Sequence, residues 1–506
     1  MKIKQLFSQI FIIAILVMGS FGSASPAQGS AAAKAQPVLL ELAAQNPSQR
    51  VDVIVQKMAG ATSTEERAAA LGGKVTQDLH IINAFAAEMS ARDAVELAKT
   101  SDVRWVSIDA EVKSSVCAQC VDTTNLVNTY IRDIRANKVW NAAPYIQGQG
   151  IGVAVIDSGV NPNGDLYTNM GVNRQVADVR FNSDYNQSPF DGYGHGTHVA
   201  SIVGGDGSES SGKYIGVAPM ANIINVKVSN DDGSAMMKDV VRGLQWVFDN
   251  KDTYNIRVVN LSLNSAVAET YNTSPLDAAV EILWFNGVVV VVSAGNKGNG
   301  AIYPPANDPF VITVGAVDDK GTTSTSDDVL ASFSAYGNSE NGAVKPDLVA
   351  PGTNIIARLV NQNMGVAGAH PANKVGNQYF RMSGTSMAAP MVSGAVALLL
   401  QDEPGLTPDQ VKYRLMATAN KTWSGYDANK AGAGYLDVYA AVNGATSESA
   451  NTGSIPSHLL YTGSDPISWD SVGWNSVGWN SVGWNSVGWN SVGWNSVGWN
   501  SDYWGN

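Results

Sequence analysis

The chain has 506 residues, with 44 acidic and 32 basic side chains and a formal net charge of −12 at neutral pH. This length exceeds that of a usual single domain and leaves room for a large buried core beside further domains. The acidic balance gives no basic footprint of the kind that nucleic-acid-binding proteins carry, so we expect no nucleic-acid partner.

Residues 1–27 have the three regions of a secretory signal peptide. Lys2 and Lys4 precede an apolar run at residues 10–18, and small residues follow as far as Ala27. The apolar run is much shorter than the roughly 20 residues that cross a bilayer. With no cysteine near the cleavage region, a lipoprotein anchor is excluded. We therefore expect a secreted, extracellular protein, in which residues 28–49 form a linker.

Residues 50–112 are predicted to form a compact α+β block. The expected strands are Val51–Gln56, Gly73–Leu79, Ala84–Met89 and Val103–Ser107, and the expected helices are Ser63–Leu71 and Ala91–Lys99. Their order, β-α-β-β-α-β, is that of a ferredoxin-like fold.

The next segment, residues 113–130, holds the only two cysteines of the chain, Cys117 and Cys120. A Cys-x-x-Cys pair can be a redox or metal motif. A zinc site would need two further ligands that are not evident, and no thioredoxin-like pattern surrounds the pair. For an exported chain, the simpler interpretation is a local disulfide or two free thiols in a linker.

Residues 131–445 alternate strands with helices, which predicts a doubly wound α/β fold with a parallel sheet and helices on both faces. The expected strands are Ile151–Ile156, Ile223–Val228, Val258–Leu263, Val288–Ser293 and Ile312–Val317, and the expected helices include Lys238–Asn250, Leu276–Phe285 and Ser386–Leu400. Thr407-Pro-Asp-Gln410 is a capping box with proline at the first helical position, so it predicts the start of a closing helix.

Three segments of this region supply an acid, a base and a hydroxyl. Ala154-Val-Ile-Asp-Ser-Gly contains Asp157, Gly194-His-Gly-Thr-His contains His195, and Ser383-Gly-Thr-Ser-Met-Ala-Ala-Pro contains Ser386. A free serine is a poor nucleophile, and a neutral imidazole can take its proton as it attacks. A carboxylate can fix the tautomer of that imidazole and stabilise the imidazolium. The order Asp, His, Ser is one of the known triad orders.

Other interpretations of single motifs remain open. Asp-Ser-Gly alone could be a turn after a strand. His195 and His198 alone could be a metal pair, although their spacing lacks the His-Glu-x-x-His helix pattern. We expect His198 to be a packed structural histidine.

Together the three motifs resemble those of subtilisin-like serine proteases (subtilases). The resemblance implies a subtilisin-like catalytic domain at 131–445 and a serine endopeptidase that forms an acyl-enzyme without a catalytic cofactor. Residues 50–112 are similar to the family's propeptide, which assists folding and inhibits the cleft; a permanent small domain is the alternative. Self-cleavage between Asp109 and Asn128 would then mature a zymogen. Structural Ca²⁺ is possible by resemblance, with Asp165 and the loop 206–211 as candidate oxygen ligands.

The resemblance also implies a reaction centre and a substrate cleft. Asn296, which ends the β-branched run from Val288, corresponds to the side-chain oxyanion donor, beside the backbone N–H of Ser386. The residues expected to bind an extended polypeptide are Gly233, Ser234 and Ala235 on one edge and Ser262, Leu263 and Asn264 on the other. Ordinary strand ends are the alternative for both edges.

Two residues depart from the family pattern near the specificity pocket. Asn264 stands where glycine is usual, and Ile302 stands where a small residue is common. We expect them to make a shallower pocket that cleaves poorly after bulky aromatic residues. The Tyr303–Pro304 bond is a candidate cis peptide, because X-Pro bonds adopt cis at modest cost.

The chain ends with a linker at 446–464 and a tryptophan-rich tail at 465–506. A five-residue unit recurs eight times from Asp465 to Trp504 and holds eight of the 13 tryptophans. An odd period on a strand sends successive tryptophans to opposite faces, and a glycine in the core repeats disfavours a helix. A flexible adhesive tail is the simplest interpretation; a small β-solenoid or a surface- or glycan-binding ladder is the alternative.

Two classes of function follow from these features. The first is a secreted, self-processing endopeptidase. The second is a surface-associated binding protein in which the tail does the main work and the protease fold is either vestigial or used once, to process itself. The presence of Asp157, His195, Ser386 and Asn296 favours the enzyme.

Overall fold

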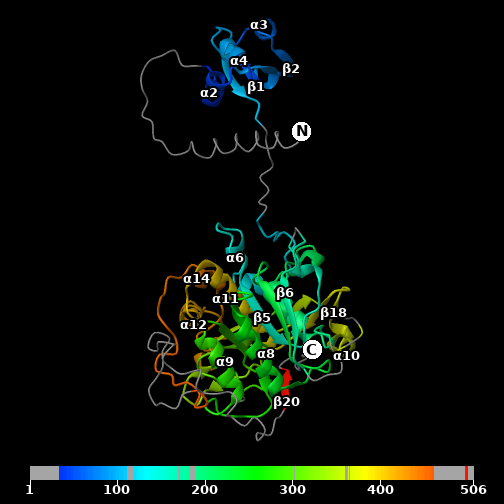
Figure 1. Cartoon of the computed structure of the whole chain (residues 1–506), viewed down its shortest axis with the longest axis vertical. Helices are drawn as coiled ribbons and strands as arrows, with labels where there is room; N and C mark the ends of the chain where they lie inside the picture. The colour runs from blue at the N-terminus through cyan, green and yellow to red at the C-terminus, as the bar shows by residue number, and fades with distance from the viewer. Residues whose placement is uncertain are drawn as a thin grey trace. The chain divides into compact units, whose positions relative to one another are not determined.

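The computed structural model describes residues 34–110, 119–168, 171–182, 188–300, 302–358, 363, 365–460 and 496–499. The predicted signal peptide lies outside these residues. The chain divides into two compact units, Met1–Val116 and Cys117–Asn506, which are described separately (Figure 1).

The N-terminal unit contains a four-stranded antiparallel sheet with the order β2-β3-β1-β4. Its elements are α2 (Pro37–Gln45), β1 (Arg50–Lys57), α3 (Thr64–Ala70), β2 (Lys74–Leu79), η1 (His80–Ile82), β3 (Ala84–Ser90), α4 (Ala91–Ala98) and β4 (Val103–Ile108). Every strand and helix predicted for residues 50–112 is present, with bounds within one residue of those expected.

Helix α2 lies within the segment that was expected to be a linker. It begins at Pro37, a residue favoured in a first helical turn. Its Leu39 is fully buried in the same core as Leu97 and Val106. The unit therefore starts before residue 50, because an apolar side chain of this segment completes its core.

The C-terminal unit is built on a sheet with the order β13-β12-β11-β9-β5-β7-β6, to which β16 adds beside β12. All pairs are parallel except β12 with β13. The strands are β5 (Gly152–Asp157), β6 (Gln175–Arg180), β7 (Asn222–Lys227), β9 (Ile256–Leu261), β11 (Val289–Ser293), β12 (Ile312–Asp318), β13 (Val329–Leu330) and β16 (Leu348–Pro351).

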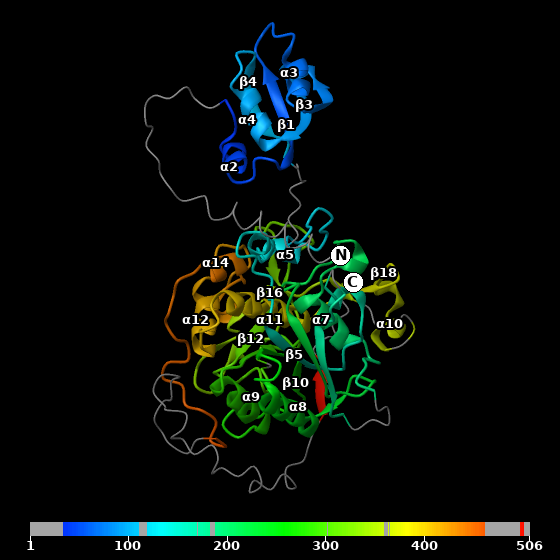
Figure 2. The same cartoon turned by 45° about the horizontal axis from the view of Figure 1, so that its top comes forward.

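Helices cover both faces of this sheet (Figures 1 and 2). Helices α7 (His195–Gly204) and α11 (Thr385–Asp402) pack against each other, as do α8 (Met237–Asn250) and α9 (Pro275–Phe285). The remaining helices are α5 (Tyr130–Asp133), α6 (Asn137–Trp140), α10 (Gly365–Ala369), α12 (Pro408–Ala417), α13 (Ala428–Ala431) and α14 (Val438–Val442), with η2 (Gly164–Leu166), η3 (Ser208–Ser210) and η4 (Pro371–Asn373). The predicted doubly wound architecture is confirmed.

The sequence pattern explains the centre of this unit. All five residues of β11 are buried, as expected of a β-branched run in a parallel sheet covered on both faces. Helix α11 is buried from Thr385 to Leu400, so it passes through the core as predicted. The capping box is also confirmed, because Thr407 and Gln410 exchange side-chain and backbone hydrogen bonds at the start of α12.

Two predicted segments differ from the structure in more than the exact position of their ends. The strand expected at Val258–Leu263 ends at Leu261, and a short strand, β10 (Leu263–Ser265), starts after Ser262. The expected linker at 446–464 is packed against the unit as far as it is described, with Ser457 fully buried. We call residues 446–460 the strap.

Smaller sheets complete the unit. Strands β14 (Gly337–Asn338) and β15 (Val344–Lys345) form a hairpin, and β17 (Ile355–Arg358), β18 (Lys374–Val375) and β19 (Tyr379–Met382) form a three-stranded sheet. A third small sheet has the order β10-β20-β8, in which β20 (Ser496–Trp499) of the tail lies between β10 and β8 (Ala235–Met236). Both pairings of β20 are antiparallel.

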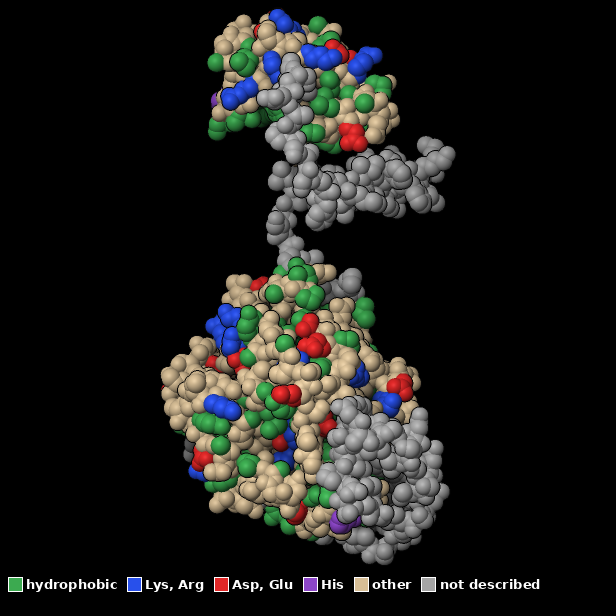
Figure 3. All heavy atoms as spheres, turned by 90° about the vertical axis from the view of Figure 1, so that its left-hand side faces the viewer, with side chains coloured by type: hydrophobic (Ala, Val, Ile, Leu, Met, Phe, Trp, Pro, Cys, Tyr) green, Lys and Arg blue, Asp and Glu red, His purple; other side chains and the backbone are tan. Residues whose placement is uncertain are grey.

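The surface carries charges of both signs in small groups. On the face in Figure 3, Lys, Arg, Asp and Glu side chains are scattered over a mostly neutral surface. Among the residues that the structure describes, no helix is long and apolar enough to cross a membrane.

Candidate active site

Asp157 and His195 meet at the carboxyl end of the central strand β5. Asp157 is the last residue of β5, and His195 is the first residue of α7. The imidazole Nδ1 lies 2.8 Å from Oδ1 and 3.0 Å from Oδ2 of the carboxylate. Both side chains are fully buried. The predicted acid and base are therefore in direct contact, in a geometry that fixes the imidazole ring.

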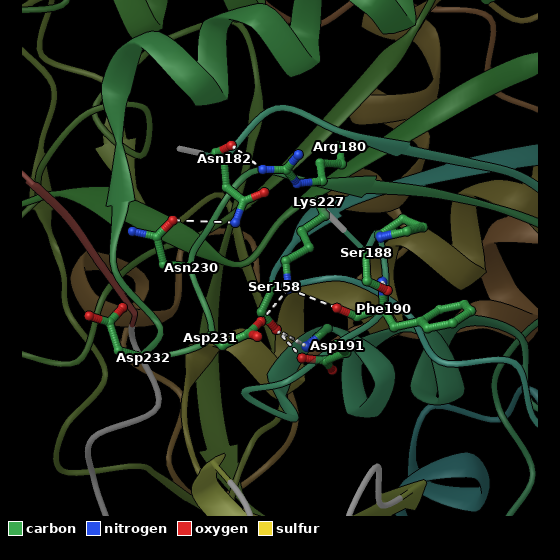
Figure 4. A network of polar contacts seen from close by, with 12 residues as sticks. Ser158, Arg180, Asn182, Ser188, Phe190, Asp191, Lys227, Asn230, Asp231 and Asp232 are labelled. Carbon is green, nitrogen blue, oxygen red and sulfur yellow. Dashed lines mark hydrogen bonds and ion pairs between the residues drawn. The ribbon is translucent and has the colours of Figure 1, made fainter. Parts of the chain in front are cut away.

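A second buried carboxylate, Asp191, holds the start of α7 (Figure 4). Its oxygens accept the backbone N–H groups of Gly194 (2.7 Å) and Thr197 (2.8 Å). Such groups lack partners within a helix, so Asp191 satisfies them. Burial raises the pKa of Asp191, and these hydrogen bonds oppose that rise. Ser158 connects the two acids, because its hydroxyl lies 2.8 Å from Asp191 Oδ1 and 3.2 Å from Asp157 Oδ1.

Asp191 was not among the residues predicted from the sequence. An acidic residue just before a helix is a recognisable start signal, and that signal was available in Phe-Asp-Gly-Tyr-Gly-His.

His198 has the packed, structural environment that was expected of it. Its Nε2 lies 3.1 Å from the carbonyl oxygen of Phe380. Burial is the main cause that lowers the pKa of His198 to about 3. The ring is therefore neutral at physiological pH and cannot serve as a second protonated catalyst.

Ser386 lies in the first turn of α11 and is held by a network from β9. Its hydroxyl donates to the carbonyl of Ser262 (3.1 Å), and the Ser262 hydroxyl donates to the carbonyl of Ser386 (3.0 Å). The amide of Asn260 donates to the Ser262 hydroxyl (2.9 Å), and the Ser393 hydroxyl donates to Asn260 Oδ1 (2.9 Å). The network fixes the start of α11 against the sheet. Of its members, only Ser262 and Ser386 were predicted from the sequence as site residues.

Asn296 presents an amide donor beside the start of α11. Its Oδ1 accepts hydrogen bonds from the backbone N–H and the hydroxyl of Thr385, the residue before Ser386. Its Nδ2 is buried and has no hydrogen-bond partner among the described residues. Buried donors are nearly always satisfied. This N–H group is therefore available to an oxygen of a bound substrate, and it could stabilise negative charge that develops there.

The model of the subtilase family matches residues 148–435, which is more than half of the chain and includes every residue of the site described so far. The chain belongs to the subtilase family. It is thus a subtilisin-like serine peptidase, a class that needs no cofactor for catalysis.

Known relatives extend this likeness over most of the chain. This subtilase is 37% identical to serine protease AprX of Bacillus subtilis over 400 residues, which cover 77% of this chain and 84% of AprX. It is 30% identical to subtilisin NAT of Bacillus subtilis subsp. natto over 379 residues, covering 73% and 83% of the two chains. A crystal structure of a cold-adapted subtilisin-like serine proteinase matches at 32% identity and a TM-score of 0.45, covering 59% of this chain and 91% of that one.

The residues expected to bind substrate lie on either side of β20. Leu263 and Asn264 belong to β10, and Ala235 belongs to β8. Gly233 and Ser234 form the turn before β8, in which Gly233 has a φ of +86° and Asn230 donates its N–H to the Ser234 carbonyl. The two predicted edges of the cleft in this subtilase are therefore close enough to share one strand between them.

Asn264 and Ile302 were expected to fill the specificity pocket. The Asn264 amide donates to the carbonyl of Ser293 at the end of β11 (2.9 Å), and the residue is buried. Ile302 is partly buried against the core. The expected cis bond at Tyr303–Pro304 was wrong, since the cis bond is the next one, Pro304–Pro305. Both bonds precede a proline, so the sequence alone could not separate them.

The candidate calcium ligands Asp165 and the loop 206–211 lie together, and the carboxylate of Asp165 accepts hydrogen bonds from the protein. Asp165 Oδ2 accepts the Tyr379 hydroxyl (2.6 Å), and Oδ1 accepts the backbone N–H of Glu209 (2.8 Å). Its carboxylate therefore binds protein donors. Among the described residues, no three His, Cys, Asp or Glu side chains are grouped so that they could hold a metal ion.

Cys120 is disulfide-bonded. The one other cysteine of the chain, Cys117, lies outside the described residues. The segment that follows Cys120 packs on the C-terminal unit, where the Asn128 amide donates to the Ile215 carbonyl (2.7 Å). A disulfide-bonded Cys120 fits the disulfide alternative for the cysteine pair and offers no thiolate to a zinc ion.

Proposed function

We propose that this subtilase is a secreted endopeptidase that hydrolyses extracellular proteins through Ser386, His195 and Asp157, and that it is made as a self-processing zymogen. The contact between His195 and both oxygens of Asp157 carries the proposal. It leaves Nε2 as the ring nitrogen that can exchange a proton with the substrate and the nucleophile.

In the first half-reaction, the Ser386 oxygen attacks the scissile carbonyl and its proton moves to Nε2 of His195. The hydroxyl must first turn away from the Ser262 carbonyl, which accepts its hydrogen bond at 3.1 Å in this structure. The Asp157 carboxylate stabilises the imidazolium that forms. The imidazolium then gives its proton to the leaving amine, the C–N bond breaks, and the acyl group stays on Ser386. In the second half-reaction, a water molecule attacks the acyl carbonyl and gives its proton to Nε2 of His195. The bond to Ser386 then breaks, the imidazolium returns the proton to the serine oxygen, and the acid product is released.

The tetrahedral intermediates carry a negative oxygen, and two N–H groups are assigned to it. One is the Nδ2 of Asn296, which has no partner among the described residues. The other is the backbone N–H of Ser386 in the first turn of α11, where N–H groups lack intrahelical partners. The positive end of the helix dipole adds to the same effect.

We assign substrate binding to the two edges β8 and β10. An extended polypeptide placed between them would pair through its backbone, and this favours unfolded chains over compact domains. Ser262, which adjoins β10, links the substrate edge to the nucleophile through its hydrogen bonds with Ser386.

We assign the N-terminal unit to the role of propeptide, inhibiting and templating the catalytic unit until it is cut between Asp109 and Asn128. Its separate core supports this assignment, because the unit can fold around its own buried residues. Parallel sheets form slowly, so a preformed docking surface would help the catalytic unit to nucleate.

The test compares the purified zymogen with its Ser386→Ala variant by intact mass over time, while hydrolysis of an unfolded protein is followed in the same tubes. The native chain should lose its N-terminal residues and degrade substrate, and the variant should do neither. Ser326→Ala, at an exposed serine before β13, is the matched control and should behave like the native chain. If the native chain stays whole and inactive after its propeptide has been dissociated, the tail-dependent binding protein becomes the better explanation.

A further inference from the structure

One four-residue segment of the tail, β20, lies between the two strands assigned to substrate. Against β10, Trp499 pairs with Leu263, Gly498 with Asn264 and Val497 with Ser265. Against β8, Ser496 pairs with Met236 and Val497 with Ala235. The segment is the middle strand of an antiparallel sheet of three, and Figure 2 shows it in red beside β10.

We propose that a Ser-Val-Gly-Trp unit of the tail occupies the substrate-binding slot and acts as a tethered competitive inhibitor of the peptidase. The inference rests on the proposed function, because the slot is a substrate site only if the chain is an endopeptidase. It replaces the adhesive interpretation of the tail with a regulatory one, in which the partner of the tail is the cleft of the same protein.

The direction of β20 relative to the nucleophile supports this role. The strand runs antiparallel to β10, so its Trp499 end is the end nearer to Ser262, which directly precedes Leu263. The Ser262 carbonyl is the acceptor of the Ser386 hydroxyl. The tail segment therefore approaches the nucleophile with its C-terminal end, as the acyl side of a cleaved polypeptide must.

Self-cleavage would not empty the slot. A cut after Trp499 would release only residues that follow it and not the Ser-Val-Gly-Trp segment itself. The segment in the cleft stays attached to the enzyme through its N-terminal side. It would then behave as a product that cannot diffuse away.

The chemistry of the segment suits strand addition. Pairing through the backbone requires N–H and C=O groups on both sides, and none of the residues of β20 is a proline. Residues 471–500 are six identical Ser-Val-Gly-Trp-Asn units without a charged side chain. Each unit offers the same backbone pattern, so any of them can replace the one at 496–499.

Tethering allows a weak contact to matter. An intramolecular ligand acts at an effective concentration on the order of millimolar, so a segment with millimolar affinity still competes with dilute substrate. Six equivalent units raise the chance of occupation further. A good substrate at high concentration would displace the tail, so inhibition should raise KM and leave kcat unchanged.

The test uses the matured enzyme with its full tail and the same enzyme truncated after Ser464. Truncation should lower the KM for a short peptide substrate by about threefold or more at constant kcat. The peptide Ser-Val-Gly-Trp-Asn-Ser-Val-Gly-Trp-Asn should inhibit the truncated enzyme competitively. The same peptide with proline in place of each valine should not, because proline cannot donate to either edge.

Variants of the full chain test whether inhibition depends on one particular unit or on the repeat as a whole. Val497→Pro alone should change KM little, since a neighbouring unit takes its place. Valine-to-proline substitution in all six units, at 472, 477, 482, 487, 492 and 497, should reproduce truncation. An unchanged KM on truncation, together with no inhibition by the peptide, would overturn the inference.

A failure of the proposed function would look different. If neither the full-length nor the truncated protein has activity, the proposed endopeptidase function fails, whatever the tail does. Binding of the same peptide to the truncated Ser386→Ala protein, measured by calorimetry, then tests the slot without catalysis. Saturable binding that the proline peptide lacks would support the tail as the occupant of the slot, and no binding would contradict it.

Discussion

The side-chain oxygen of Asn296 is held by Thr385 through two hydrogen bonds, one from the backbone N–H (2.9 Å) and one from the hydroxyl (3.0 Å). The Thr385 hydroxyl also accepts the backbone N–H of Gly295 (3.1 Å). Because Thr385 directly precedes Ser386, one residue sets both the orientation of the amide and the first turn of α11. The predicted oxyanion donor and nucleophile are therefore positioned together.

Asn296→Ala should reduce kcat and leave KM nearly unchanged, because the amide is needed only when the oxyanion develops. We expect a loss of about 10²–10³-fold, the range found when one such donor is removed from a subtilisin. Steady-state kinetics on a short peptide substrate give both constants. A rise in KM at constant kcat would mean that Asn296 binds the ground state instead.

Thr385→Val should misorient the Asn296 amide without removing it. The substitution keeps the shape of the side chain and the backbone bond, and it removes the hydroxyl that donates to Asn296 and accepts from Gly295. A loss of one or two net hydrogen bonds corresponds to about 3- to 30-fold in kcat. Thr385→Ser should restore most of the rate. If Val and Ser variants are equally slow, packing of the methyl group matters more than the hydroxyl.

Asp191→Ala should loosen the start of α7, where His195 lies. The N–H groups of Gly194 and Thr197 would lose their acceptor, which costs on the order of 1–3 kcal/mol of stability. Urea unfolding in the Ser386→Ala background avoids self-digestion and measures this loss. Asp191→Asn keeps one acceptor oxygen, so its stability should lie between that of the native side chain and that of the alanine variant. Equal stability of all three proteins would contradict the helix-start role.

Asp133 should make stability fall as pH rises. Burial, and then the charges of Asp319 and Asp328, raise the pKa of Asp133 to about 8. An unfolded chain has an aspartate pKa near its usual value of about 4. The folded protein holds this proton more tightly than the unfolded chain does. The stability that protonated Asp133 contributes is therefore complete below about pH 4 and is lost as pH rises through 8.

Asp133→Asn removes this slope, because the amide does not titrate. The free energy of unfolding of the variant, relative to that of the native protein, should therefore rise by on the order of 1–3 kcal/mol between pH 5 and pH 9. Urea unfolding in the Ser386→Ala background at both pH values measures the difference. A constant difference between the two proteins at both pH values would exclude Asp133 as the titrating group.

Elements with a strong local signal were predictable from sequence. The β-branched run of β11, the apolar helix α11 and the capping box at Thr407 each follow from a few neighbouring residues. The N-terminal unit was predicted to within one residue for the same reason. Helix α2 was missed because its apolar residues lie beside a polar, alanine-rich segment that resembled a linker.

The supporting network of the site could not be predicted in the same way. Two hydrogen bonds of this network, from Ser262 to Ser386 and from Ser393 to Asn260, join positions more than 120 residues apart. No local pattern marks such partners, since they are set by how α11 packs on β9. Strands β8 and β10 are also too short to show the alternation of apolar and polar residues that marks a strand in a sequence. The pairing of β20 with them depends on how distant parts of the chain come together.

The strap has a practical consequence for where this protein can be shortened. Ser457 donates its backbone N–H to both carboxylate oxygens of Glu281 on α9 (3.1 and 2.8 Å). Glu281 is fully buried, and burial followed by the charge of Asp308 raises its pKa well above the usual value. A chain that ended just after α14 would remove both of these hydrogen bonds from the buried acid. The natural place to end an active, tail-free enzyme is therefore beyond Leu460, and the repeat can be removed there without damaging the core.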